Sequence, residues 1–176
     1  MRSRNEKLSL LFREKNPQKH RKGINKLEVL GSSLFSAGRD GVVREWDLDN
    51  LSVKQVLDSH VHWVNDIQID SERGLLFSAS SDTNILIWNL NTRKGIPDCR
   101  IEQHKDYLQS IKYVQENHWL YAGGQDGHLV RWDMNQPDNP RFLRIHNTQG
   151  TSIWCIDTDR TGEVICATFS NKVKLT

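Results

Sequence analysis

Three related stretches decide the fold: SAGRDGVVREWD at 36–47, SASSDTNILIWN at 78–89 and AGGQDGHLVRWD at 122–133. Each contains an aspartate that is followed six residues later by a tryptophan, and the three tryptophans are 42 and 44 residues apart. Self-similarity at a fixed period of this size indicates a repeat architecture, in which each copy is one supersecondary unit. The chain therefore contains at least three copies of one structural module.

Each copy consists of short apolar or β-branched runs separated by turn residues. In the second copy the runs are 64–69, 75–80 and 84–89, and the turns between them read DSERG and SSDT. A fourth run ends each copy, as VKQVL, CRI and RFLRI in turn. Four short antiparallel strands per repeat are typical of one blade of a β-propeller. We therefore predict an all-β fold in which each copy is a blade.

The period also predicts the domain boundaries. We expect blade 1 at about 20–58, blade 2 at about 60–102, blade 3 at about 104–146 and an incomplete blade 4 at about 148–176. Residues 1–19 form a basic N-terminal arm, whose strand-like run at 7–12 would complete the last blade of a full ring. Because propellers usually close with 4–8 blades, we expect an open arc: the N-terminal part of a larger propeller, or a truncated product of one.

A set of polar residues recurs with the tryptophans. It comprises His20, Ser36, Asp40 and Trp46 in the first copy, His60, Ser78, Asp82 and Trp88 in the second, and His104, Asp126 and Trp132 in the third. Ala122 takes the serine position of the third copy. An early histidine, a late aspartate and a final Trp-Asp or Trp-Asn are the signature of a WD repeat.

Serine, histidine and aspartate are also the parts of a hydrolytic triad. Three features argue against catalysis: the set is periodic, no G-x-S-x-G elbow presents either serine, and a tryptophan, which can only donate, accompanies each set. We interpret the set as a hydrogen-bonded chain from tryptophan to serine to histidine to aspartate, which fixes the strand register. We therefore expect no catalytic residue and no enzymatic activity.

No metal, cofactor or small-molecule substrate is predicted. His60 and His62 form an H-x-H pair, but no further ligand stands at a suitable spacing. The three cysteines show no metal-type spacing and indicate reduced thiols in a cytoplasmic or nuclear protein. Apolar runs are too short for a membrane span, so no membrane association is expected.

The charge of the chain is unevenly distributed. Residues 1–26 hold nine Lys or Arg and two Glu, whereas the net charge of the whole chain is only +2. A basic arm can contact nucleic acid or an acidic partner, or can simply be a solvated terminus. Since no aromatic residues are interleaved with the basic ones, we do not expect nucleic acid as a partner.

Aromatic residues recur where the first strand of each blade begins. Trp63 and Tyr107 stand three residues after His60 and His104, and Trp154 begins the same strand in the fourth copy. In propellers this position lies at the mouth of the central channel, on the top face. Because aromatic residues and arginine are favoured anchors at interfaces, we predict a partner-binding surface there. Its members are Arg39, Trp63, Asn65, Ser81, Tyr107, Gln109, Gln125 and Trp154. The alternative is that the aromatic rings merely cover the neighbouring blade.

The chain resembles the WD-repeat family along about residues 20–176. Within that family, the segments GINKLEV, LFSAGRDGVVREW, HWVNDIQI, SASSDTNILIWN and QHKDYLQSIKY, in this order and spacing, resemble the WD-repeat activator subunits of ubiquitin-specific proteases. HWVNDI and HKDY go beyond what a WD repeat requires, while the part from ENHWLYAGG onward matches the general pattern alone. The resemblance implies a non-catalytic scaffold that binds a ubiquitin-specific protease and activates it.

Two other functions stay open at this point. The chain could be a substrate receptor of a cullin-type ubiquitin ligase; such receptors often carry W-D-x-R, whereas this chain reads WDLD, WNLN and WDMN. It could also be a generic assembly scaffold in chromatin or RNA complexes, in which the basic arm would matter.

Overall fold

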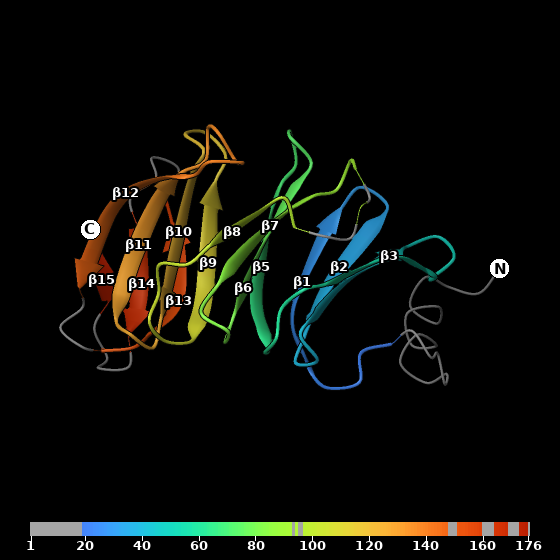
Figure 1. Ribbon diagram of the computed structural model, residues 1–176, viewed down its shortest axis with the longest axis horizontal. Helices are drawn as coiled ribbons and strands as arrows, with labels where there is room; N and C mark the ends of the chain where they lie inside the picture. Colours follow the sequence, from blue (N-terminus) through green and yellow to red (C-terminus); the bar gives the residue numbers. More distant parts are fainter. Residues whose placement is uncertain are drawn as a thin grey trace.

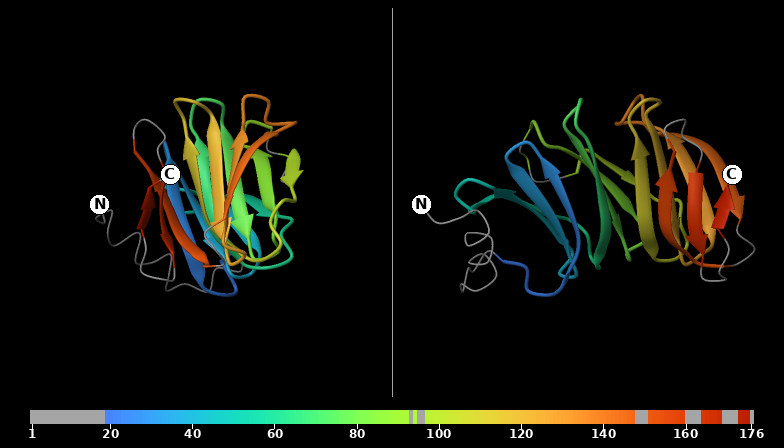
Figure 2. Two further views of the ribbon diagram at one scale, coloured as in Figure 1. Left: turned by 90° about the vertical axis from the view of Figure 1, so that its left-hand side faces the viewer. Right: turned by 180° about the vertical axis from the view of Figure 1, so that it is seen from behind.

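The computed structural model is an open arc of antiparallel sheets that stand side by side (Figures 1 and 2). It describes residues 19–92, 94, 97–147, 151–159, 164–168 and 173–175. All assigned elements within these ranges are strands, and none of the described residues forms a helix long and apolar enough to cross a bilayer. The predicted all-β, partial-propeller fold is therefore confirmed. The strand expected at 7–12 lies outside the described residues.

Each sheet corresponds to one sequence copy. Blade 1 contains β1 (Ile24–Leu30), β2 (Ser33–Gly38), β3 (Val42–Asp47) and β4 (Val53–Asp58). Blade 2 contains β5 (Val64–Asp70), β6 (Leu75–Ser80), β7 (Ile85–Asn89) and β8 (Cys99–Ile101). Blade 3 contains β9 (Leu108–Val114), β10 (Trp119–Gly124), β11 (His128–Asp133) and β12 (Arg141–Asn147). Blade 4 contains β13 (Ile153–Thr158), β14 (Val164–Thr168) and β15 (Val173–Leu175). In every sheet the strands pair in chain order.

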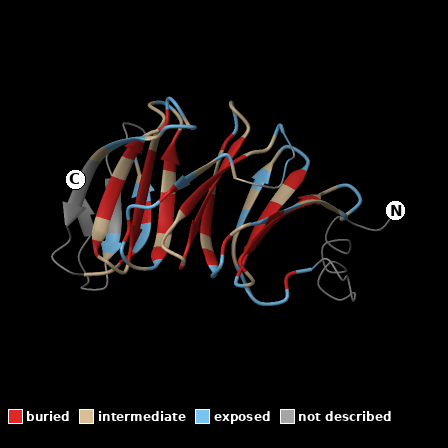
Figure 3. Cartoon of the chain, in the orientation of Figure 1, coloured by how far each residue is buried: buried red, intermediate tan, exposed pale blue. Residues whose placement is uncertain are grey.

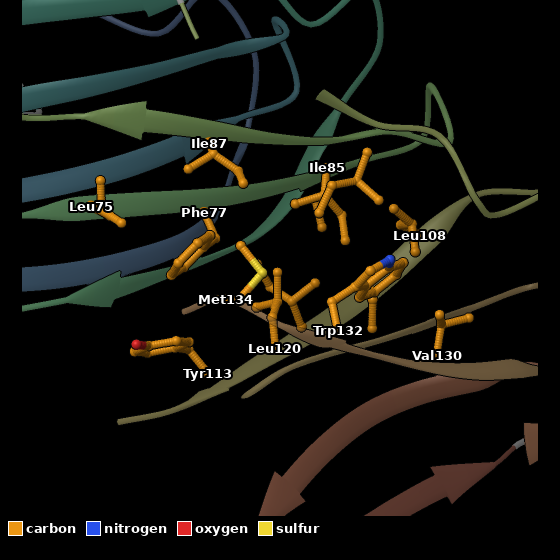
Figure 4. Packing of buried hydrophobic residues seen from close by; sticks show 14 residues of the cluster. Leu75, Phe77, Ile85, Ile87, Leu108, Tyr113, Leu120, Val130, Trp132 and Met134 are labelled. Carbon is orange, nitrogen blue, oxygen red and sulfur yellow. The ribbon is translucent and has the colours of Figure 1, made fainter. Parts of the chain in front are cut away.

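The hydrophobic cores lie between the blades. Every residue of β6 is buried (Figure 3), and alternate side chains of this strand enter two different cores. Phe77 packs toward blade 3 with Tyr113, Leu120 and Met134 (Figure 4), while Leu76 packs toward blade 1. A third core joins blades 3 and 4. Each sheet therefore depends on its neighbours, because a single blade exposes two apolar faces that only adjacent blades can cover.

The innermost strands β1, β5, β9 and β13 lie next to one another along the inner side of the arc. A buried carboxylate helps to join them: Asp66 on β5 accepts hydrogen bonds from Ser110 Oγ at 3.2 Å and Ile111 N at 3.0 Å. Lys26 Nζ of blade 1 lies 3.4 Å from the same carboxylate. Asp66 thus links three blades.

Each inner strand is interrupted by a β-bulge at its second residue. The strand register shifts at Asn25, Asn65, Gln109 and Trp154, which are equivalent positions of the four blades. A bulge adds an unpaired residue and turns its side chain in a new direction. Trp154 therefore corresponds to Asn65 and Gln109, whereas Trp63 and Tyr107 each stand two residues earlier, just before their strands begin.

Candidate functional site

The predicted surface residues line one hollow where the inner strands begin, with a volume of about 620 Å³. All eight of them border it, and the structure adds two more, Asn25 and His62. The members come from all four blades, so the hollow exists only when the blades are stacked.

The same backbone contact builds this hollow in three blades. In each of these blades, the residue just before the turn aspartate donates its N–H to a backbone carbonyl oxygen. That carbonyl belongs to the third residue after the blade histidine. The contacts join Arg39 to Gly23, Ser81 to Trp63 and Gln125 to Tyr107, at 2.8 to 2.9 Å. This link places the turn between the second and third strands beside the start of the first strand. Side chains that are distant in sequence consequently face one hollow.

Aromatic rings form the exposed part of the site. Trp63 is 40% exposed, Tyr107 43% and Trp154 51%. His62 joins the first two, since its ring centroid lies 5.5 Å from that of Trp63 and 5.7 Å from that of Tyr107, with which it stacks. Exposed rings of this size present large apolar area to a partner at a low cost in side-chain entropy.

Arg39 is held over the aromatic group. Its guanidinium carbon lies 4.9 Å from the centroid of the Trp63 ring, and its Nε donates a hydrogen bond to Asn25 Oδ1 at 2.9 Å. Stacking and one fixed hydrogen bond orient the planar guanidinium, so fewer rotamers must be lost when the terminal N–H groups bind a ligand.

Amide side chains of the site connect neighbouring blades. Asn25 Nδ2 donates to Val64 O at 2.9 Å, and Asn65 Nδ2 donates to Leu108 O and to Ser81 Oγ. Ser81 is buried and accepts this hydrogen bond, so its position is that of a support rather than of an exposed contact. The site therefore combines amide side chains that are fixed by hydrogen bonds with exposed aromatic rings.

The second predicted group of residues is hydrogen bonded in blade 2. Trp88 Nε1 donates to Ser78 Oγ at 2.8 Å, His60 Nε2 lies 2.8 Å from the same oxygen, and His60 Nδ1 lies 2.8 Å from Asp82 Oδ2. A carboxylate can only accept, so Nδ1 carries the proton and Ser78 donates to Nε2. Ser78 has no exposed surface. The chain links strands inside the blade.

Blade 1 repeats this arrangement and adds a cation. Trp46 Nε1 donates to Ser36 Oγ at 2.8 Å, and His20 bridges Ser36 and Asp40 at 2.7 and 2.8 Å. Arg44 Nη1 lies 3.0 Å from Asp40 Oδ2 and 2.7 Å from His20 Nδ1. Burial, reinforced by the charge of Arg44, lowers the pKa of His20 despite the hydrogen bond to Asp40.

Blade 3 has only half of the chain. His104 Nδ1 lies 2.9 Å from Asp126 Oδ2, but no hydrogen-bond partner is found for the buried His104 Nε2 within the described part of the chain. The missing group is the hydroxyl that Ala122 lacks. Trp132 stays close, with its ring centroid 6.1 Å from that of His104. A buried ring nitrogen without a partner costs stability.

The turn aspartates are strongly acidic. Burial alone would raise the pKa of Asp82, but the hydrogen bond from His60 and the backbone N–H groups of Asn84 and Val61 outweigh it and lower this pKa to about 2. His104 and backbone donors lower the pKa of Asp126 to about 2 against the same opposing effect of burial. Both carboxylates are therefore ionised acceptors at neutral pH.

Metal ligation finds no support in the arrangement of the histidines. The ring nitrogens of His60 are hydrogen bonded to Ser78 and Asp82, and the ring of His62 stacks on that of Tyr107. The described residues contain no group of three or more His, Cys, Asp or Glu side chains that could hold a metal ion.

The repeat itself is recognised by comparison with known families. The model of the WD domain, G-beta repeat, matches residues 51–89 and 96–133. The chain carries WD repeats. Each matched segment of this WD-repeat chain runs from the outer strand of one blade to the third strand of the next, β4 to β7 and β8 to β11. The repeat unit of the family model is therefore offset by one strand from the structural blade and from the sequence copies defined above.

Among the solved structures that share this arrangement of strands, one is a propeller domain. It is the crystal structure of the WD40 β-propeller domain of Doa1, with a TM-score of 0.79 and 20% sequence identity over 90% of this chain and 52% of that one. This likeness shows the fold. The WD-repeat chain spans about half the length of that propeller chain.

Proposed function

We propose that this WD-repeat chain is a non-catalytic interaction scaffold that binds a ubiquitin-specific protease through the inner-strand hollow and activates it. The observation that carries the proposal is the gathering of Trp63, Tyr107, Trp154 and Arg39 around one hollow. Exposed aromatic and arginine side chains that gather around one hollow have the composition of interface anchors.

The choice of a ubiquitin-specific protease rests on the resemblance of the sequence. The segment HWVNDI contributes Trp63 and Asn65 to the hollow, and HKDY contributes Tyr107. These are the letters that exceed the demands of a WD repeat and that resemble the WD-repeat activator subunits. The same residues thus carry both the resemblance and the exposed rings.

A scaffold role also agrees with the use of the Ser-His-Asp sets. Ser36 and Ser78 are buried, and each accepts a tryptophan N–H while it contacts histidine. A nucleophile must be reachable by its substrate and free to lose its proton to the base. These serines instead hold strands in register.

A direct assay tests this function. The chain is mixed with purified ubiquitin-specific proteases, and hydrolysis of a fluorogenic ubiquitin substrate is followed together with binding by calorimetry. We expect one protease to bind and to gain activity, and Trp63→Ser/Tyr107→Ser to lose both effects. A matched control is Phe142→Ser on β12, which removes an exposed aromatic ring from an outer strand. Absence of binding to every protease tested would contradict the proposal.

A further inference from the structure

The described residues that line the hollow carry a positive charge and no negative charge. Arg39 is the only guanidinium or ammonium group among the described lining residues, and none of them is an aspartate or glutamate. In the described part of the chain, no carboxylate pairs with Arg39, whose hydrogen bond goes to the neutral amide of Asn25. A guanidinium oriented in this way and not neutralised favours an anionic group.

The rest of the lining can bind a polypeptide. Gln109 and Gln125 both border the hollow, and within the described residues neither side-chain amide has a hydrogen-bond partner. Such amides can donate to and accept from the peptide groups of an extended segment. The rings of Trp63, Tyr107 and Trp154 stand beside them with 40 to 51% of their surface exposed.

We propose that the hollow binds an extended protein segment in which an aspartate or glutamate lies next to a large apolar residue. The carboxylate pairs with the terminal N–H groups of Arg39, and the apolar side chain packs on the rings of Trp63 and Tyr107. This inference rests on the proposed function, because it names the chemistry of the partner segment at the same site.

The charge of the hollow favours a peptide over a nucleic acid. A nucleic acid gains its affinity from several Lys or Arg contacts to successive phosphates. The described lining supplies one cation and two unpaired amides instead. One carboxylate, rather than a row of phosphates, matches this arrangement.

A positional-scanning library of short peptides, probed with the 176-residue chain, tests the inference. We expect Asp or Glu to be selected at one position and Phe, Trp, Tyr, Leu or Ile beside it. The selected peptide should bind Arg39→Glu about tenfold more weakly or worse, since charge-assisted hydrogen bonds are lost and repulsion is added. Arg39→Gln should lose the preference for acidic residues without reversing it, which guards against a folding defect of Arg39→Glu.

The matched control is Arg100→Glu, because Arg100 carries the same charge on the outer strand β8. It should leave the selected peptide's affinity unchanged. The inference would be overturned if the library selected Lys or Arg, or selected no residue at all. It would also be overturned if Arg39→Glu and Arg100→Glu lost affinity equally, or if a single-stranded oligonucleotide displaced the peptide. Its failure is separable from that of the proposed function: a protease that needs Trp63 and Tyr107 while no acidic residue is selected refutes this inference alone.

Discussion

Trp88 Nε1 donates a hydrogen bond to Ser78 Oγ at 2.8 Å, and that oxygen lies 2.8 Å from His60 Nε2. One hydroxyl group therefore satisfies two buried ring nitrogens from different parts of blade 2. Blade 3 lacks this hydroxyl, and the ring nitrogen of His104 that would face it is left without a partner among the described residues.

The first prediction is that Ala122→Ser stabilises the protein. The new hydroxyl supplies a partner for His104 Nε2, and a buried hydrogen bond contributes about 1 kcal/mol. The matched change in blade 2, Ser78→Ala, should cost about 1–3 kcal/mol, because it leaves His60 and Trp88 unpaired. Urea unfolding followed by tryptophan fluorescence measures both effects. A lower midpoint for Ala122→Ser would show that the hydroxyl is not accepted there.

The second prediction concerns acid. The pKa values of Asp82 and Asp126 are about 2 in the folded chain, below the ordinary aspartate value. Their ionisation stabilises the fold fully above the unfolded-state pKa of about 4, and this contribution is lost as the pH falls from about 4 toward 2. Each aspartate accounts for about 2 kcal/mol. The free energy of unfolding, measured between about pH 6 and about pH 2, gives the loss. Asp82→Asn should flatten this dependence of the unfolding free energy on pH. A steep loss of equal size in Asp82→Asn would contradict the assignment.

The third prediction concerns a strained turn. Gly41 and Gly127 follow their turn aspartates with φ of +83° and +69°, and Thr83 takes φ of 72° at the same position of blade 2. A β-branched residue in this left-handed region costs about 1–2 kcal/mol, whereas glycine does not. Thr83→Gly should therefore raise the unfolding free energy by a few tenths to about 1 kcal/mol, the entropy of glycine being subtracted. Thermal unfolding measures this, and the reverse change Gly127→Thr should destabilise blade 3.

The fourth prediction concerns the exposed apolar side chains of β1 in blade 1. Leu27 and Val29 are exposed on β1, and Leu27 borders an apolar hollow of about 400 Å³ together with Trp46. Exposed apolar surface next to such a hollow promotes association. We expect the 176-residue chain to self-associate and Leu27→Glu/Val29→Glu to shift it toward monomer. Sedimentation velocity checks this, with Val61→Glu, another exposed valine, as the control. A sharply monomeric unmodified chain would contradict the expectation.

The sequence predicted the fold well because the period of the repeat is written into buried residues. Tryptophan, histidine and aspartate positions repeat because their contacts repeat inside each sheet, as the pairs His60 with Asp82 and His104 with Asp126 illustrate. The number of strands per blade follows from the same period. The short run CRI, for example, forms the short strand β8 (Cys99–Ile101).

Other residues of the hollow and of the hydrogen-bond networks were not predicted from the sequence. Asn25 enters the hollow at the bulge position that Asn65 and Gln109 occupy in the next two blades, so the repeat itself was the available clue to it. Arg44 joins the network of blade 1 where the other blades have Leu86 and Val130, so a departure from the repeat, rather than the repeat itself, was the available clue.

The most direct test of the central claim is amide hydrogen exchange of the WD-repeat chain with and without the ubiquitin-specific protease that binds it. We predict slower exchange on binding at 61–66 and 105–110, where Trp63 and Tyr107 flank the hollow, and no change on the outer strands β4, β8 and β12. Protection confined to those outer strands, with the hollow unaffected, would contradict the claim that the inner-strand hollow is the binding site.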